Sequence, residues 1–169
     1  MNDPQPPEET TRPPCLEDIL FICRQLNAAQ ADYIIIGGLA IFELGLARMT
    51  EDIDLLVDSD PDNVVRIKKA LAGLPDNAVR DVEPTDVREY LVVRVNDEVT
   101  IDLMASACGI GYKQASAMVL WREIEGVRIP FATPELLWLT KQTHREKDAL
   151  DRAYLRKLFA DRGIEPPSR

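Results

Sequence analysis

The segment YIIIGGLAIFELGLARMTEDIDLLVD, residues 33–58, decides the fold of this 169-residue chain. Its first four residues are apolar and end at Gly37 and Gly38, and two aspartates later alternate with apolar residues. Side chains alternate across a strand, so Asp52 and Asp54 point to one face while their apolar neighbours point to the other. Two like charges on one face of a buried strand repel each other, so the presence of both aspartates there suggests a chemical role.

The hydrophobic pattern around this segment predicts a single α/β domain with a mixed sheet, helices packed on it and further helices at the C-terminal end. The elements that we expect are a helix at 15–30, strands at 33–36 and 53–57, helices at 39–46 and from 61 to about 74, a hairpin formed by REYLVVRV and VTIDLM, a weaker strand at 127–129, and one long or two short helices after Thr133. The core residues that we expect are Ile34, Ile36, Ile53, Leu55, Val57, Ile101 and Leu103. Residues 1–14 contain five prolines and predict a flexible tail, which leaves residues 15–169 for the domain.

The net charge of −9 and the pI near 4.7 argue against a protein that grips a nucleic-acid backbone extensively. Residues 1–120 hold 10 basic and 21 acidic side chains, whereas residues 121–169 hold 10 and 8, so an anion site should draw on the C-terminal part. The three cysteines form no CxxC pair, and no apolar run approaches the roughly 20 residues of a membrane helix. We therefore expect a cytoplasmic protein that does not enter the membrane.

Gly37 and Gly38 stand between a predicted strand and a predicted helix. Glycine at this place lets the backbone approach a ligand closely, and the start of the helix offers free N–H groups to an anion. On the glycines alone, a tight turn that needs a positive φ is the favoured explanation. The spacing excludes the two commonest phosphate loops, because neither G-x-G-x-x-G nor a following Gly-Lys-Ser/Thr is present.

Three aspartates are candidate metal ligands. Asp52 and Asp54 suit a hard cation such as Mg²⁺, which prefers oxygen ligands, although a solvated strand end is the alternative. Asp102 lies in TIDLM between two apolar residues, where a lone carboxylate is costly unless it is paired or liganded. Beside the other two it would complete a cluster able to hold two metal ions about 3.5–4 Å apart. A hairpin residue that faces water is the alternative for Asp102.

Together these motifs resemble the nucleotidyltransferase superfamily, which has the DNA polymerase β-like fold. The glycine pair, thirteen intervening residues, DID with apolar flanks, and a later strand with a third aspartate match its pattern over roughly residues 33–104. The resemblance implies a minimal nucleotidyltransferase domain in which the glycine turn holds the phosphates of an NTP. It also implies that Asp52, Asp54 and Asp102 are the catalytic residues and bind two Mg²⁺ ions.

A narrower resemblance involves LARMTEDIDLLV, which is similar to the Arg-x-Thr-x-Asp-Ile-Asp pattern of small prokaryotic nucleotidyltransferases related to the AbiEii abortive-infection toxins. These proteins carry a downstream helical Lys…Lys-Asp…Asp motif, and TPELLWLTKQTHREKDALD has Lys141, Lys147, Asp148 and Asp151 in matching places. The resemblance implies a cognate antitoxin or toxin as a possible partner. The nucleotide-binding residues that we expect are Gly37, Gly38, Arg48, Thr50, Lys141 and Lys147.

Read as one helix, the C-terminal segment places Lys141, Arg145 and Asp148 on one face at spacings of four and three, and Lys147 and Asp151 on another. A triphosphate needs cations, and the first 120 residues carry an acidic excess. We therefore expect at least one of the two lysines to point into the cavity that holds the aspartates. A lysine that serves as a surface ion pair is the alternative.

The predicted activity is a metal-dependent transfer of a nucleoside monophosphate from an NTP, such as ATP, to an unidentified hydroxyl on a tRNA, a protein or a small molecule. Asp102 is the acid expected nearest to the nucleophile. A non-catalytic protein of the same fold that binds a partner in a toxin–antitoxin pair is the first alternative, favoured by Leu39 where many active members have serine. A metal-dependent Asp-x-Asp glycosyltransferase is a third reading, although it would normally need a larger domain.

Overall fold

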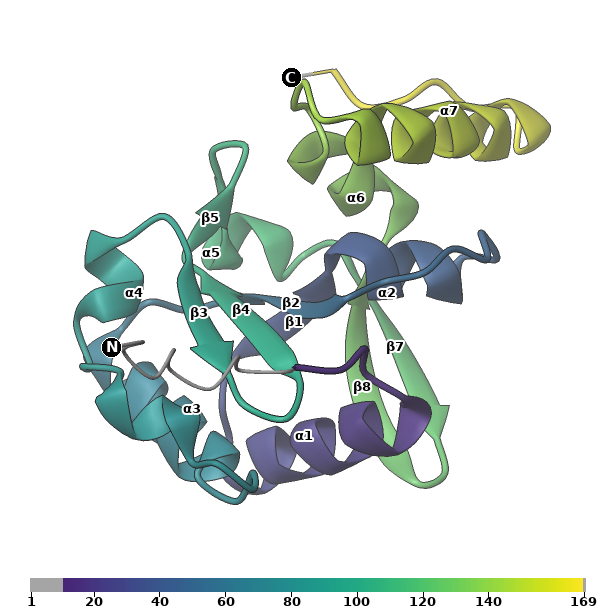
Figure 1. Cartoon of the computed structure of the whole chain (residues 1–169). Helices are drawn as coiled ribbons and strands as arrows, with labels where there is room; N and C mark the ends of the chain where they lie inside the picture. The colour runs from purple at the N-terminus through teal and green to yellow at the C-terminus, as the bar shows by residue number, and fades with distance from the viewer. Residues whose placement is uncertain (1–10, 169) are drawn as a thin grey trace, which may run out of the picture.

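The computed structural model describes residues 11–168, and the statements below concern that part of the chain. The elements, as labelled in Figure 1, are α1 (Leu16–Ala28), β1 (Tyr33–Ile36), α2 (Gly37–Glu43), β2 (Asp52–Val57), α3 (Pro61–Leu71), the 3₁₀ turn η1 (Ala78–Asp81), α4 (Asp86–Glu89), β3 (Val93–Asn96), β4 (Thr100–Met104), β5 (Ser106–Ala107), β6 (Ile110–Gly111), α5 (Tyr112–Ala115), β7 (Val119–Ile124), β8 (Val127–Ala132), α6 (Pro134–Thr140) and α7 (Glu146–Asp161). The flexible tail predicted for residues 1–14 falls largely outside the described residues and stays a prediction, as does the domain boundary at residue 15.

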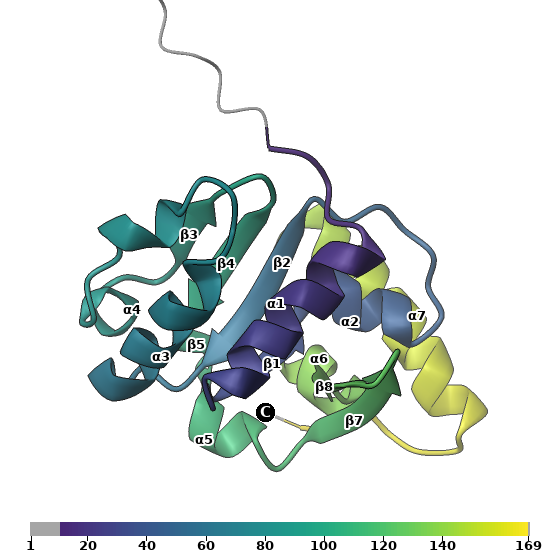
Figure 2. The same cartoon turned by 90° about the horizontal axis from the view of Figure 1, so that it is seen from below.

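Six strands form one mixed sheet in the order β3-β4-β2-β1-β8-β7. β2 runs antiparallel to β1 and parallel to β4, and β1 runs parallel to β8. Helices α1 and α3 cover one face of the sheet, whereas α2 and α6 lie on the other side with α7 beyond α6 (Figures 1 and 2). The predicted class, an α/β domain with a mixed sheet and C-terminal helices, is confirmed.

The hydrophobic core is built on the two strands of the opening segment. All four residues of β1 are buried, because β1 lies between β2 and β8 and has helices over both faces. In the first half of β2, half-buried aspartates alternate with fully buried Ile53 and Leu55. All the predicted core residues are buried: Ile34, Ile36, Ile53, Leu55, Val57, Ile101 and Leu103.

The helix predicted at 39–46 begins earlier and ends earlier, as α2 (Gly37–Glu43). Gly37 adopts a φ of +68°, a left-handed conformation that glycine takes at little cost, and this lets the strand turn directly into the helix. The helix ends before Gly45, whose φ of +107° is incompatible with a continuing α-helix. Helix α3 likewise ends at Leu71 and not near Leu74.

A strand that the sequence reading missed, β7, pairs with β8 at the edge of the sheet. The weak strand predicted at 127–129 is the beginning of β8, which extends to Ala132. The two-residue turn between them, Glu125 and Gly126, has a positive φ at both positions, as a tight hairpin of type I′ requires. β7 escaped prediction because its middle residues are exposed and polar or aromatic, so no buried apolar pattern marks it.

The C-terminal segment forms two helices, which is the second of the two predicted alternatives, so the shared helix face expected from one continuous helix is not found. Helix α6 ends at Thr140, and α7 begins at Glu146 after a short irregular connection. Lys141 follows the end of α6 and Arg145 is the N-cap of α7, so these two residues do not share a helix face with Asp148. Within residues 11–168, no helix has both the length and the apolar character needed to cross a membrane.

Candidate active site

Three carboxylates meet because β2 and β4 run parallel and in register. Asp54 on β2 is paired with Asp102 on β4, and side chains at paired positions of neighbouring strands point to the same face of the sheet. Asp52 stands two residues before Asp54 on that same face. All three line one cavity of about 450 Å³, so the predicted convergence of the aspartates is found.

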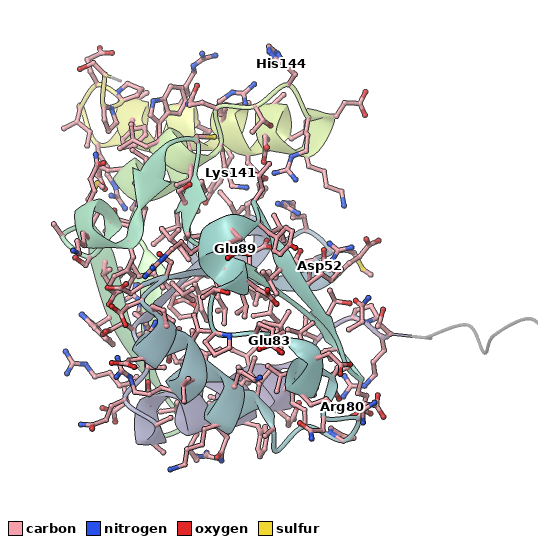
Figure 3. All side chains as sticks on the ribbon, turned by 90° about the vertical axis from the view of Figure 1, so that its left-hand side faces the viewer. Asp52, Arg80, Glu83, Glu89, Lys141 and His144 are labelled. Atoms are coloured by element: carbon pink, nitrogen blue, oxygen red, sulfur yellow. The ribbon has the colours of Figure 1, made fainter. Side chains whose placement is uncertain are left out.

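This cavity, which we call the acid–cation cavity, collects every site residue that the sequence suggested. The lining includes Gly37, Gly38, Arg48, Thr50, Asp52, Asp54, Asp102, Lys141 and Lys147. In Figure 3, Asp52 lies on the strand side, Lys141 lies between the sheet and the C-terminal helices, and His144 lies on the outer surface. Both predicted lysines therefore face the cavity that holds Asp54, while their role toward a nucleotide stays a prediction.

The glycine turn forms one wall because no side chain fits there. A Cβ atom on Gly37 would lie 2.1 Å from the Oδ2 atom of Asp54, and one on Gly38 would lie 2.7 Å from the Oγ1 atom of Thr50. Both distances are shorter than any real van der Waals contact. The backbone of the turn is thus pressed directly against two other residues of the cavity, and Gly37 also needs its positive φ.

The electrostatics of the strand side is repulsive. Burial, followed by the charges of Asp102 and Asp52, raises the pKa of Asp54 to about 6. Burial and the charge of Asp102 also raise the pKa of Asp52. The sheet therefore holds three carboxylates closer together than their charges favour, and a cation in this position would stabilise them.

Arg94 on β3 supplies such a charge, and the sequence reading missed it. Its Nε and Nη2 atoms donate to the two carboxylate oxygens of Asp102 at 2.9 Å each, and Nη2 lies 3.4 Å from Oδ2 of Asp52. The hydrogen bonds to Asp102 raise the pKa of the guanidinium above its ordinary value. The predicted hairpin could have pointed to Arg94, because the register of β3 and β4 places Arg94 directly opposite Asp102.

The opposite side of the cavity holds a buried ion cluster. Lys141 is only 5% exposed, and its Nζ atom lies 2.7 Å from Oδ2 of Asp151 and 3.3 Å from Oδ1 of Asp148. Asp151 is fully buried and also accepts two hydrogen bonds from Arg48, at 2.9 and 2.7 Å. Charges are tolerated at this depth because each one is paired in good geometry.

Asp148 completes the cluster from the first turn of α7. Burial alone would raise the pKa of its carboxyl group, but a hydrogen bond from the Thr143 hydroxyl and the charges of Lys141 and Arg145 lower it below its ordinary value. The Nε atom of Arg145 donates to Oδ2 of Asp148 at 3.0 Å. Asp148 thus stays ionised and fixes the connection between α6 and α7 next to the cavity.

Helix α7 is tied to the glycine-turn side at two points. Arg48, in the loop before β2, reaches across to Asp151 on α7. The hydroxyl of Tyr154, one turn further along α7, donates to the carbonyl oxygen of Leu44 at 2.7 Å. These contacts join segments about a hundred residues apart in the chain, and they position Lys141 opposite the aspartates.

A second cavity of about 380 Å³ adjoins the first and shares Gly37, Asp54, Asp102 and Lys141 with it. Its distinct lining is largely apolar and consists of Ile36, Val92, Met104, Ala107 and Thr140. The second cavity thus adds an apolar surface next to the charged groups that the two cavities share.

The donor set suits a hard divalent cation by its chemistry. The acid–cation cavity offers carboxylate oxygens and no sulfur or imidazole ligand, and the absence of a Cβ on Gly37 lets the carboxylate of Asp54 lie directly against the glycine turn. As the side chains stand, no group of three or more His, Cys, Asp or Glu residues in the described part of the chain is disposed to hold a metal ion. Both oxygens of Asp102 face Arg94.

Comparison with known proteins supports the fold and identifies the family. A crystal structure described as a "putative nucleotidyltransferase" from Thermotoga maritima is similar in fold, with a TM-score of 0.51 and 15% identity over 86% of this chain and 92% of that one. No curated protein matches the sequence significantly. The family model described as "Nucleotidyl transferase AbiEii toxin, Type IV TA system" matches residues 18–156, which include the sheet, the glycine turn, the three aspartates and the ion cluster. The chain therefore belongs to the AbiEii family of nucleotidyltransferase toxins.

Proposed function

We propose that the protein is a metal-dependent nucleotidyltransferase that transfers a nucleoside monophosphate from an NTP to an acceptor hydroxyl. One observation carries this proposal: three carboxylates, a glycine turn without side chains and a set of fixed cations surround a single cavity. Phosphoryl transfer depends mainly on positioning and charge, and these groups supply both.

In this proposal Asp52, Asp54 and Asp102 would hold two Mg²⁺ ions, which would offset the charge of the triphosphate and activate the acceptor oxygen. The raised pKa values of Asp52 and Asp54 support it, because burial and the neighbouring carboxylates both disfavour the charged forms, and a bound cation would offset both effects. The side chains of the three acids would have to turn toward a common point, since Asp102 is engaged with Arg94.

The triphosphate would lie against the glycine turn and under the cations from the C-terminal helices. Lys141 is held at a fixed place by two buried carboxylates and faces the cavity. Lys147 lines the same cavity from the exposed side of α7, and its charge acts on the carboxyl group of Asp52. Arg48 is already paired with Asp151, so we assign it mainly to holding the cavity wall.

The chemistry follows from this placement. The acceptor oxygen attacks the α-phosphorus of the NTP, the bond from that phosphorus to the bridging oxygen breaks, and pyrophosphate leaves. The proton of the acceptor hydroxyl passes to a carboxylate, for which Asp102 is our candidate. The largely apolar part of the adjoining cavity, which the first cavity does not share, gives either the base or the acceptor a surface on which to pack.

We further propose that the protein acts in the cytoplasm as the toxin of a pair with a cognate antitoxin. The family match supports this role, and the unpaired Cys15, Cys23 and Cys108 are compatible with a reducing compartment. Induced expression of the wild-type chain in a bacterial host should slow growth, and expression of Asp54→Asn should not. Equal growth inhibition by both forms would exclude transfer as the toxic activity.

Thermal unfolding with Mg²⁺ and each NTP, added singly and together, tests the proposed nucleotide binding. A ligand that binds only the folded protein raises its stability, so the largest shift should require both metal and nucleotide. Incubation of α-labelled NTPs with cell extract should then label one acceptor class in a metal-dependent manner. The matched control is Asp81→Asn, which changes an exposed carboxylate away from the cavity. Labelling that persists in Asp54→Asn would overturn the proposal.

A further inference from the structure

We propose that Arg94 is a built-in competitor for the metal site, because its guanidinium occupies carboxylate oxygens that a divalent cation needs. This inference deepens the proposed function and rests on it. It concerns a residue outside the glycine and aspartate motifs, and it explains how the acid cluster can be assembled without a bound metal.

The geometry is that of a tethered counter-ion. Two parallel N–H···O bonds of 2.9 Å join Arg94 to both oxygens of Asp102, and the same Nη2 atom lies 3.4 Å from Oδ2 of Asp52. Bidentate pairing of this kind is among the stronger side-chain contacts. One guanidinium thus contacts two of the three candidate metal ligands.

The position of Arg94 allows it to leave. Its side chain is 54% exposed, whereas the side chain of Asp102 is 8% exposed. Arg94 stands on β3, the strand at the edge of the sheet, and its side chain lines both the acid–cation cavity and the adjoining cavity. It also lines a further hollow of about 460 Å³ beside Arg12 and Asn96. The guanidinium can therefore move aside while the buried carboxylate stays in place.

The guanidinium of Arg94 and a divalent metal ion cannot both occupy the oxygens of Asp102, because both are positively charged. A divalent metal at Asp102 would lie within a few ångströms of the guanidinium, and like charges at that distance repel strongly inside a protein. A bound triphosphate changes this balance, because its oxygens offer the displaced guanidinium a new bidentate partner. Metal and nucleotide should therefore bind together more tightly than either binds alone.

An ordinary cross-strand ion pair would give the same contact without this effect. Opposite charges on paired strands stabilise a sheet slightly, and Arg94 is indeed paired with Asp102 in the ladder. The two roles differ in one measurable respect. Loss of a structural pair lowers stability and leaves metal affinity unchanged, whereas loss of a competitor raises metal affinity.

The experiment measures Mn²⁺ binding to the full chain by electron paramagnetic resonance, first without nucleotide. We expect Arg94→Gln to bind Mn²⁺ at least tenfold more tightly than wild type, which corresponds to about 1.4 kcal/mol. Arg94→Lys keeps the positive charge but cannot form the bidentate pair with Asp102, so its affinity for Mn²⁺ should lie between those of wild type and Arg94→Gln. Arg122→Gln is the matched control, because Arg122 is 50% exposed and pairs with Glu43 outside the cavity.

A second titration in the presence of a non-hydrolysable NTP tests the coupling. The nucleotide should enhance Mn²⁺ affinity in wild type and enhance it less in Arg94→Gln. Circular dichroism checks that each variant is folded. If Arg94→Gln does not fold, the comparison with wild type is made with Arg94→Lys. If wild type binds Mn²⁺ as tightly as these variants do, the inference is overturned while the metal proposal stands. If none of the proteins binds Mn²⁺, both are overturned.

Discussion

The two walls of the acid–cation cavity are built on opposite principles. The strand wall holds Asp52, Asp54 and Asp102 on one sheet face, where burial and the repulsion between their charges raise the pKa of Asp54 to about 6. The helical wall holds Lys141 between two carboxylates and lowers the pKa of Asp148. The strand wall keeps like charges that Arg94 offsets only in part, and the helical wall is neutralised within itself.

This difference separates ligand binding from support. A site that binds cations gains affinity when its carboxylates are not fully neutralised by the protein. The strand wall keeps such carboxylates, and their burial and repulsion lower the stability of the fold. The helical wall satisfies its own charges and can therefore be buried and rigid. Substitutions on the strand wall should thus change function most, and substitutions in the buried ion cluster of the helical wall should change stability most.

The largest effect is expected from Asp54→Asn on transfer. The variant keeps the shape of the side chain and removes the charge from the centre of the acid cluster, so the transfer rate should fall by about a thousandfold or more, near 4 kcal/mol in the barrier. Single-turnover measurement of pyrophosphate release checks this. Asp81→Asn, an exposed carboxylate, should keep the wild-type rate.

The next effect is a loss of stability from Asp151→Asn. This residue is fully buried and pairs with both Arg48 and Lys141, so its removal leaves two cations without their common partner. We expect the free energy of unfolding to fall by about 3–5 kcal/mol. Urea denaturation at neutral pH measures the change. Asp161→Asn, exposed at the end of the same helix, should lose less than about 0.5 kcal/mol, and equal losses would refute the contrast between the walls.

A smaller effect concerns the pH dependence of stability. The pKa of Asp54 is raised from 3.8 to about 6, so the folded protein binds this proton more tightly than the unfolded chain does. Stability should therefore decrease as pH rises from about 4 to about 6, by roughly 3 kcal/mol at most from this group. Urea denaturation of Asp54→Asn should show a gain over wild type at pH 7.5 that vanishes near pH 4. A gain that is independent of pH would contradict the raised pKa of Asp54 in the folded protein.

The smallest effect is expected from Lys147→Ala on nucleotide affinity. Lys147 is exposed at the rim, so the variant should keep its melting temperature while its Kd for the NTP with Mg²⁺ rises about threefold to tenfold, or roughly 1 kcal/mol. Isothermal titration checks this value. Lys157→Ala, also exposed on α7 and away from the cavity lining, should bind as wild type does. A normal affinity for Lys147→Ala would leave phosphate binding to Lys141 alone.

The strand wall could be predicted from the sequence because it depends on local patterns. The alternation in EDIDLLV sets Asp52 and Asp54 on one face, and the glycine pair marks the turn before them. The third acid required only that TIDLM be a strand beside β2, which the family pattern also implied. The predicted core residues follow from the same alternation.

The remaining features depend on register and on long-range contacts. Arg94 becomes part of the site only through the pairing of β3 with β4, and nothing in VVRV itself distinguishes it from a solvent-facing arginine. The helical pattern of the C-terminal segment suggested that Lys141 and Asp148 lie on one helix face. They do meet, but because the chain turns between α6 and α7. The exposed middle of β7 carried no apolar signal.

The carboxylate of Asp151 has a consequence for how the site can be dissected. Arg48 and Lys141 come from different elements, yet both pair with this one group. Removal of either cation leaves the other as the sole partner of a fully buried charge, so the second removal acts on a changed protein. The contributions of Arg48 and Lys141 are therefore not additive, and neither can be read from a single substitution.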